Sequence, residues 1–202
     1  GIGVALEKRD TWLGGGYTSL NAQLYRGTLD IRDAMSEAFD KPPFGYGTEG
    51  SFGKATVQFA RLQYVMPKLS VYVGGGLQRA SKNLDTYEKL SLGGPKAVRA
   101  YASGEVLVDD GWLGTVELRF ALKPEASLFA FYDAAKGDFF HDPRAVDVVT
   151  SRSLRGHGIG FNWSKPGQVT MNLSVAWRGT GAGLTDGGDR NPRVYWSIQK
   201  AF

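Results

Sequence analysis

The 202-residue chain contains no cysteine and only two histidines, His141 and His157. The absence of cysteine excludes disulfide bridges and cysteine-ligated zinc. The two histidines lack the close His-x-x-x-His spacing of a helical metal pair, so we expect no metal site. No Gly-x-Ser-x-Gly element marks a hydrolase nucleophile. We therefore expect a protein that is not an enzyme and holds no cofactor.

Long apolar runs and a concentrated basic patch are also missing. No stretch approaches the ~18 consecutive apolar residues of a transmembrane helix. The start of the chain lacks the layout of a signal peptide, so any export signal is expected to have been removed. The net charge is only +4, and the densest charged run, Leu6 to Asp10, mixes both signs. This distribution indicates that the protein does not bind nucleic acid.

Glycine and aromatic residues are abundant instead. The chain has 28 glycines, and 12% of its residues are aromatic. Glycine permits turns and bends in sheets, while aromatic side chains favour strands, so the composition indicates an all-β protein. Apolar and polar residues also alternate, as Leu69, Val71 and Val73 do with Ser70 and Tyr72. A period of two is typical of strands with one apolar and one polar face.

About nine strands are predicted from the alternation and the turn residues. Several reach the ~9–11 residues that a tilted strand needs to cross a bilayer, whereas strands in soluble sandwiches average ~5–6 residues. The predicted strands are 1–10, 16–30, 53–66, 69–81, 111–122, 126–137, 152–164, 168–179 and 193–202.

One of these segments changes its apolar face part of the way along. Val57 and Phe59 share one face, while Leu62 lies on the other. An extra residue in the strand would bring all three side chains to the same face. We therefore expect a β-bulge near Ala60 or Arg61.

The connections between the strands alternate in length. The tight ones are 67–68, 123–125 and 165–167, and the long polar ones are 31–52, 82–110, 138–151 and 180–192. Short periplasmic turns and long extracellular loops make this pattern in outer-membrane barrels. Tryptophans also gather near strand ends, where such barrels carry an aromatic girdle. The predicted fold class is a transmembrane antiparallel β-barrel.

The most specific pattern in the chain lies between Ala80 and Arg119. A Gly93-Gly94-Pro95 segment precedes Val98-Arg99-Ala100-Tyr101, and Glu117-Leu118-Arg119 follows on the next predicted strand. This region resembles the two-partner secretion transporters of the hemolysin-activator type, within the superfamily of outer-membrane assembly and secretion barrels. Members of that superfamily carry Val-Arg-Gly-Tyr or Val-Arg-Gly-Phe at the tip of a long loop. This chain has Ala100 in place of the glycine.

The resemblance also implies a partner for Arg99. A second family motif, an aromatic residue and an acid two positions apart, matches Phe131 and Asp133. A guanidinium on a loop inside the barrel can pair bidentately with a carboxylate on the wall. Strand alternation agrees, because it places Asp133 opposite Tyr132, and a carboxylate facing lipid would be costly. The expected loop latch and lumen residues are Val98, Arg99, Tyr101, Phe131, Asp133, Glu117 and Arg119.

The family pattern implies a barrel of sixteen strands preceded by periplasmic POTRA domains. Residues 1–202 are therefore expected to be the C-terminal part of a longer barrel, with the loop 82–110 folded inward. The expected function is secretion of a partner protein, such as an adhesin or haemolysin, through the outer membrane of a Gram-negative bacterium. Two functions stay open beside it: assembly or insertion of other outer-membrane proteins, and a passive porin. The expected partners are the secreted protein, the lipid bilayer, and N-terminal strands and POTRA domains from the same protein.

The last predicted strand resembles a barrel-assembly signal. Trp196, Ile198 and the terminal Phe202 fall on one face of it. Lys200 shares this face, and its long side chain can reach the membrane interface. We expect this strand to direct the barrel into the outer membrane.

Overall fold

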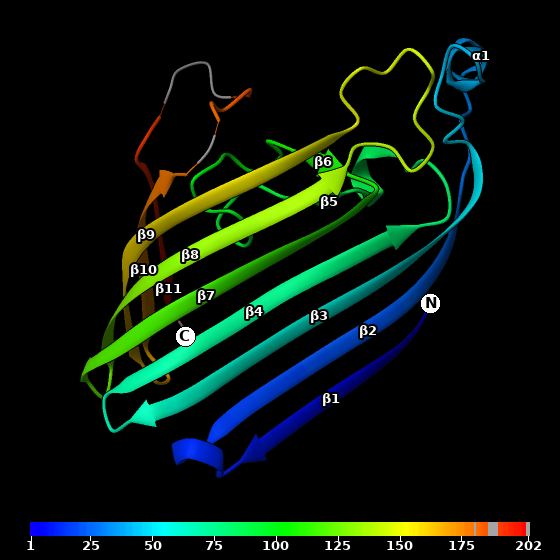
Figure 1. Ribbon diagram of the computed structural model, residues 1–202. Helices are drawn as coiled ribbons and strands as arrows, with labels where there is room; N and C mark the ends of the chain where they lie inside the picture. Colours follow the sequence, from blue (N-terminus) through cyan, green and yellow to red (C-terminus); the bar gives the residue numbers. More distant parts are fainter. Residues whose placement is uncertain (180, 186–189, 201–202) are drawn as a thin grey trace.

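The computed structural model describes residues 1–179, 181–185 and 190–200. Nine strands form one antiparallel sheet, in the order β1-β2-β3-β4-β7-β8-β9-β10-β11 (Figure 1). This confirms the predicted nine-stranded all-β architecture. The strands are β1 (Ile2–Asp10), β2 (Gly16–Leu29), β3 (Gly50–Met66), β4 (Leu69–Ala80), β7 (Asp110–Lys123), β8 (Ala126–Asp138), β9 (Ser151–Lys165), β10 (Val169–Arg178) and β11 (Arg193–Lys200).

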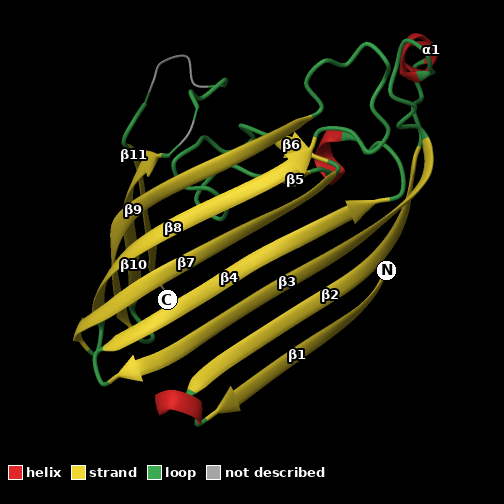
Figure 2. Ribbon diagram, in the orientation of Figure 1, coloured by secondary structure: helices red, strands yellow, loops and turns green. Residues whose placement is uncertain are grey.

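The sheet is curved and open. Its strands follow one another in chain order, and among the described residues β1 and β11 each pair with one neighbour only. Figure 2 shows the long connections at one end of the strands and the short turns at the other. The concave side of the sheet holds residues 81–109, which we call the lumen loop. An open curved sheet of this kind is the arrangement expected of part of a larger barrel.

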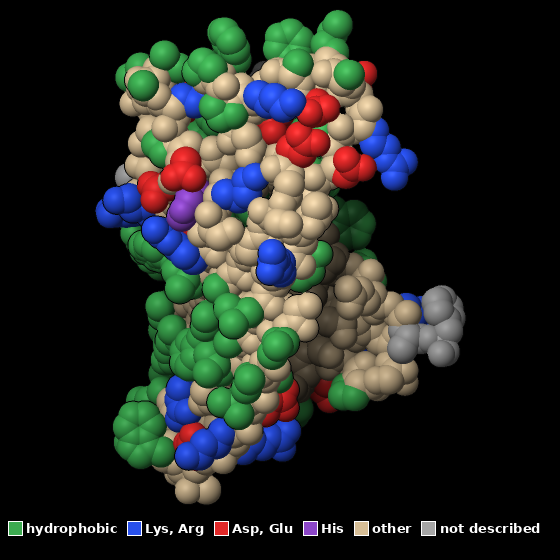
Figure 3. All heavy atoms as spheres, turned by 90° about the vertical axis from the view of Figure 1, so that its right-hand side faces the viewer, with side chains coloured by type: hydrophobic (Ala, Val, Ile, Leu, Met, Phe, Trp, Pro, Cys, Tyr) green, Lys and Arg blue, Asp and Glu red, His purple; other side chains and the backbone are tan. Residues whose placement is uncertain are grey.

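The convex face of the sheet, called the outward face below, is apolar and uncovered. Val116 and Leu118 of β7 are 49% and 50% exposed, and Ile159 of β9 is 57% exposed. Figure 3 shows hydrophobic side chains gathered over the middle of this flank, with charged side chains above and below them. Such a large apolar surface is rare on soluble monomers and indicates a face that meets lipid or protein. In the described part of the chain, no helix has the length and apolarity needed to span a membrane.

The expected bulge near Ala60 or Arg61 is wrong. The register between β3 and β4 runs without interruption from Lys54 to Tyr64, and the shift falls between Tyr64 and Met66. Arg61 therefore lies on the outward face, close to the short turns. There its guanidinium pairs with Asp10 of β1 at 2.9 Å. Because of this ion pair, a charged residue is accommodated on the otherwise apolar outward face. The interruption of the apolar pattern therefore does not require a β-bulge.

Two connections contain short helical segments. The sequence predicted a long polar connection at 31–52 and assigned no structure to residues 11–15. Helix α1 (Ala34–Asp40) lies in the long connection after β2, and the Asp33 carboxylate accepts a hydrogen bond from the Ser36 amide at its start. A 3₁₀ turn, η1 (Trp12–Gly14), joins β1 to β2.

Strand β11 includes two of the three residues of the predicted assembly signal. Trp196 and Ile198 are 70% and 56% exposed on its outward face. Phe202, the third residue of the predicted signal, lies outside the described residues. The targeting role of this strand stays a prediction.

Candidate functional site

The main hydrophobic core lies between the lumen loop and the wall of the sheet. The loop contains η2 (Thr86–Glu88), β5 (Leu90–Ser91) and β6 (Leu107–Val108), and the two short strands pair with each other. Loop and wall side chains form one buried cluster that includes Leu92, Val98, Tyr101, Val106, Val108, Phe129, Phe131 and Leu154. The loop is therefore packed against the wall as part of the folded structure.

Arg99 lies at the centre of this contact and is paired with Asp133 of β8. Its Nη2 is 2.7 Å from Oδ1 of Asp133, and its Nε is 2.9 Å from Oδ2. The backbone amide of Arg99 also donates to Oδ2 at 3.0 Å. Two parallel side-chain bonds give the bidentate geometry that favours arginine over lysine. Asp133 is completely buried, so these bonds replace its lost hydration.

Two side chains of β7 complete the set of partners. Nη1 of Arg99 is 2.6 Å from Glu117, and Nη2 donates to the Thr115 hydroxyl at 2.8 Å. Glu117 also pairs with Arg119 at 2.7 Å, so two cations face two carboxylates. We refer to Arg99, Thr115, Glu117 and Asp133 as the Arg99 cluster.

The guanidinium of Arg99 is further held by an aromatic ring. It lies 3.5 Å from the centroid of the Phe131 ring, a cation–π contact from the wall of the sheet. Burial lowers the pKa of the Arg99 guanidinium, but the bonds and charges of Asp133 and Glu117 outweigh this effect and raise its pKa. Arg99 therefore remains a cation in this partly desolvated site.

The loop tip fits a row of glycines on β9. A Cβ atom at Gly156 would lie 2.7 Å from the Ala100 Cβ, so a larger residue at either position would force them apart. Ala100 itself is buried and has no left-handed backbone conformation, which explains why alanine replaces glycine here without strain. The Gly-x-Gly-x-Gly run from Gly156 to Gly160 thus makes room for the loop tip and for rings of β8.

A second set of contacts holds the loop where it leaves the sheet. Asp109 is fully buried, and its carboxylate pairs with Lys89 at 2.8 Å. It also accepts bonds from the backbone amides of Leu84 and His141, which joins both arms of the loop to the next long connection. Sequence reasoning missed this residue, because its partners lie on segments that come together only in the folded chain.

A third contact joins the loop to the connection after β10. The Glu105 carboxylate pairs with Arg152 of β9 at 3.0 Å and accepts bonds from the Leu184 and Thr185 amides. Burial raises the pKa of this carboxyl, but the hydrogen bonds from Thr185 and Leu184 and the charge of Arg152 bring the pKa below its usual value. Sequence reasoning also missed Glu105, because its partners are far away in the chain.

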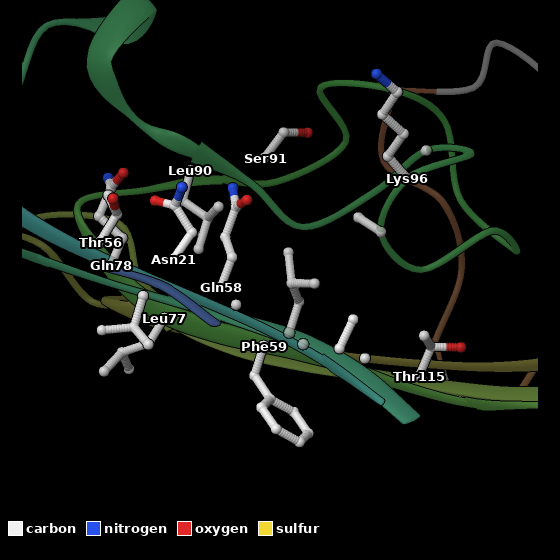
Figure 4. Close-up of a pocket in the computed structure, with 18 of the residues that line it drawn as sticks. Asn21, Thr56, Gln58, Phe59, Leu77, Gln78, Leu90, Ser91, Lys96 and Thr115 are labelled. Atoms are coloured by element: carbon white, nitrogen blue, oxygen red, sulfur yellow. The ribbon is translucent and has the colours of Figure 1, made fainter. Parts of the chain in front are cut away.

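Beyond the loop, the concave side leaves a space of about 1150 Å³ that polar and apolar residues line together. Figure 4 shows Asn21 and Gln58 pointing from the wall towards the loop, while Phe59 and Leu77 point to the opposite side of the sheet. Lys96 borders the same space from the loop. Polar side chains therefore line the interior, and apolar ones face outward, as in barrels that enclose water.

A curved antiparallel sheet with an apolar outward face and a charged loop on its polar side is typical of part of an outer-membrane β-barrel. Over 130 residues, or 60% of its length, the chain is 31% identical to the heme/hemopexin transporter protein HuxB from strains of Haemophilus influenzae. It spans 23% of the length of HuxB. These similarities confirm the resemblance to two-partner secretion transporters for a partial barrel.

The fold is similar to that of CdiB from Escherichia coli. The alignment covers 97% of this chain and 35% of CdiB, with a TM-score of 0.65 and 21% identical residues. At this identity, the similarity concerns the fold alone. No family model matches the chain.

Proposed function

We propose that this chain is the C-terminal part of an outer-membrane transporter that secretes a partner protein of the adhesin or haemolysin kind. In this proposal, residues 1–202 form one barrel portion, and other strands and POTRA domains of the same protein complete it. The open edges of β1 and β11 support this, because unpaired strand edges in a bilayer are strongly unfavourable. The outer membrane of a Gram-negative bacterium is the location that accommodates the apolar outward face.

The observation that carries this proposal is the Arg99 cluster on a loop inside the sheet. Val98 and Tyr101 are buried beside it, while Phe131, Asp133, Glu117 and Arg119 come from the wall. We infer that this cluster latches the lumen loop in the position needed for secretion. Breaking a buried ion pair is costly, so these contacts support a loop that is held in one position.

A comparison of secreted proteins tests the proposal. The culture medium of cells with the full-length protein is compared with that of cells lacking its gene, by quantitative mass spectrometry. Secretion of one partner predicts that one large protein disappears from the medium, while the outer-membrane protein profile stays unchanged.

The same experiment separates the two other functions. An assembly factor would instead reduce several outer-membrane proteins together, and this result would overturn the proposal. A passive porin would change neither profile but would alter solute uptake and ion flux, which would overturn it as well.

A further inference from the structure

Two cationic side chains without an acidic partner stand on the outward face of β8 and β9. Lys136 lies opposite Trp112 of β7 and Ser153 of β9, and Arg155 lies opposite Ala134 of β8. Diagonal neighbours of this kind are about 7–8 Å apart. Both side chains are exposed, and within the described ranges no ion pair joins either of them to a carboxylate.

Nearby charges do not neutralise this pair. Arg79, the next cation on this face, is already paired with Asp110 at 3.4 Å. Asp138 lies two residues beyond Lys136 on the same face but forms no ion pair with it. Lys136 and Arg155 therefore leave two positive charges available at the end of the sheet that carries the long connections.

An aromatic row lies next to this pair, on the side of the short turns. Tyr132, His157 and Trp177 occupy one row across β8, β9 and β10. The His157 and Trp177 rings are stacked at 6.3 Å between centroids. Aromatic residues prefer the boundary between headgroups and hydrocarbon, so this row indicates where that boundary falls.

Further towards the short turns, the outward face has an apolar hollow of about 520 Å³. Its centre is Ala130 of β8, whose small side chain lies between Leu118 of β7 and Ile159 of β9. The other outward-facing residues that line it include Leu128, Phe161 and Val175. The absence of a large side chain at Ala130 therefore opens a space that an alkyl chain can fill.

The spacing of hollow and cations fits one leaflet of a bilayer. Ala130 and Lys136 are six residues apart on β8, which is about 20 Å along the strand. With a strand tilt of about 45°, this is roughly 14 Å of depth. The aromatic row at Tyr132 lies between them, so Ala130 is roughly 5 Å below the boundary and Lys136 roughly 10 Å above it, at the level of the headgroups. An acyl chain of a bound lipid would thus enter the hollow while its headgroup lies beside the cations.

We propose that this strip of the outward face is a binding site for lipopolysaccharide. Its lipid A phosphates pair with Lys136 and Arg155, and one of its acyl chains fills the hollow at Ala130. This inference rests on the proposed outer-membrane location. In that membrane the long connections lie at the cell surface, where lipopolysaccharide forms the outer leaflet. Phosphate groups supply the negative charge that the two unpaired cations lack.

Titration of the full-length protein with purified lipopolysaccharide, followed by native mass spectrometry, tests the site. Neutralising both cations, with Lys136→Gln and Arg155→Gln together, should weaken binding about thirty-fold (about 2 kcal/mol). Filling the hollow with Ala130→Leu should also weaken binding, although it changes no charge. A matched control, Lys123→Gln with Lys165→Gln, removes two cations at the opposite end of the sheet and should leave binding unchanged.

Several outcomes would overturn the proposal. Unchanged binding in the double variant of Lys136 and Arg155 would contradict it. Equal weakening in the control pair would also contradict it, because this result would indicate attraction by the overall charge of the protein. Phosphatidylglycerol vesicles serve as the second probe, and an equal loss of binding to them would contradict selection of lipopolysaccharide.

Heat-modifiable migration shows that each variant is folded. Membrane fractionation and the secreted-protein comparison are measured separately, so failure of the proposed function is distinguishable from failure of this site.

Discussion

Replacing Arg99 with alanine should detach the lumen loop while leaving the barrel assembled. The change removes four side-chain bonds, two to Asp133 and one each to Glu117 and Thr115. The strands keep all their backbone pairing, because Arg99 belongs to none of them. The loss should therefore fall on the contact between loop and wall.

The size of the effect follows from the two carboxylates that the change leaves behind. Asp133 is 0% exposed and loses its ion-pair partner, while Glu117, which is 6% exposed, loses one of two cations and keeps Arg119. Removing one partner of a buried ion pair typically costs about 3–5 kcal/mol. At the lower bound, the ratio of docked to undocked loop falls roughly 100-fold. Secretion that needs the docked loop should fall with it.

Two assays follow this change in the full-length protein. Limited proteolysis of intact cells reports whether the loop is protected, and the amount of partner protein in the medium reports secretion. Arg99→Lys serves as a control, because it keeps the charge but loses the bidentate fork, and it should give an intermediate effect. A variant Arg99→Ala with a protected loop and normal secretion would refute the reasoning.

Three further predictions concern the same contact. Exchanging the charges of Arg99 and Asp133 in a double variant should restore secretion only in part, because Glu117 would then repel the new acid. Gly156→Val should undock the loop and reduce secretion, since even a Cβ atom there would lie 2.7 Å from the loop tip. Because the pKa of Glu105 is lowered in the folded protein, its contact should be fully present above the usual carboxyl pKa and lost as pH falls through the lower folded value. Loop protection measured against pH should show this, and Glu105→Gln should flatten the profile.

Each of these predictions has a result that contradicts it. Full recovery in the charge exchange would mean that Glu117 does not act on position 99. Gly114→Ala is the matched control for the glycine change, because its Cβ would meet nothing nearer than 3.7 Å, and an equal loss there would point to general strand damage. A loop contact that weakened as pH rose would contradict the lowered pKa of Glu105.

The strands were predictable because their alternation is a local property of the sequence. A period of two fixes which side chains lie on the outward face wherever the outward residues are apolar, as in β7 and β8. The pattern misled at Arg61, because its ion pair with Asp10 permits a charged residue on the outward face. Helix α1 was missed since it spans only seven residues and lies in a connection without a long apolar period.

The candidate site was predictable only where a family motif marked it. Val98, Arg99 and Asp133 were named through the resemblance, and the structure has Arg99 and Asp133 in contact. Their role in secretion remains a prediction. Asp109 and Glu105 were not found, because their partners lie on connections that come together only in the folded chain.

The most direct test of the latch asks whether a covalent bond can replace Arg99. The chain has no cysteine, so an engineered pair has no competing thiol within it. Cγ1 of Val98 lies 3.4 Å from the Cβ position of Gly156, which brings a sulfur at position 98 close to bonding distance of a cysteine at 156. Ala100→Gly is included to remove the Cβ that a cysteine at 156 would meet at 2.7 Å. Val98→Cys with Gly156→Cys and Ala100→Gly, added to Arg99→Ala, should restore secretion when oxidised and lose it again when reduced. An oxidised, folded protein that still fails to secrete would contradict the claim that Arg99 acts by holding the loop in place.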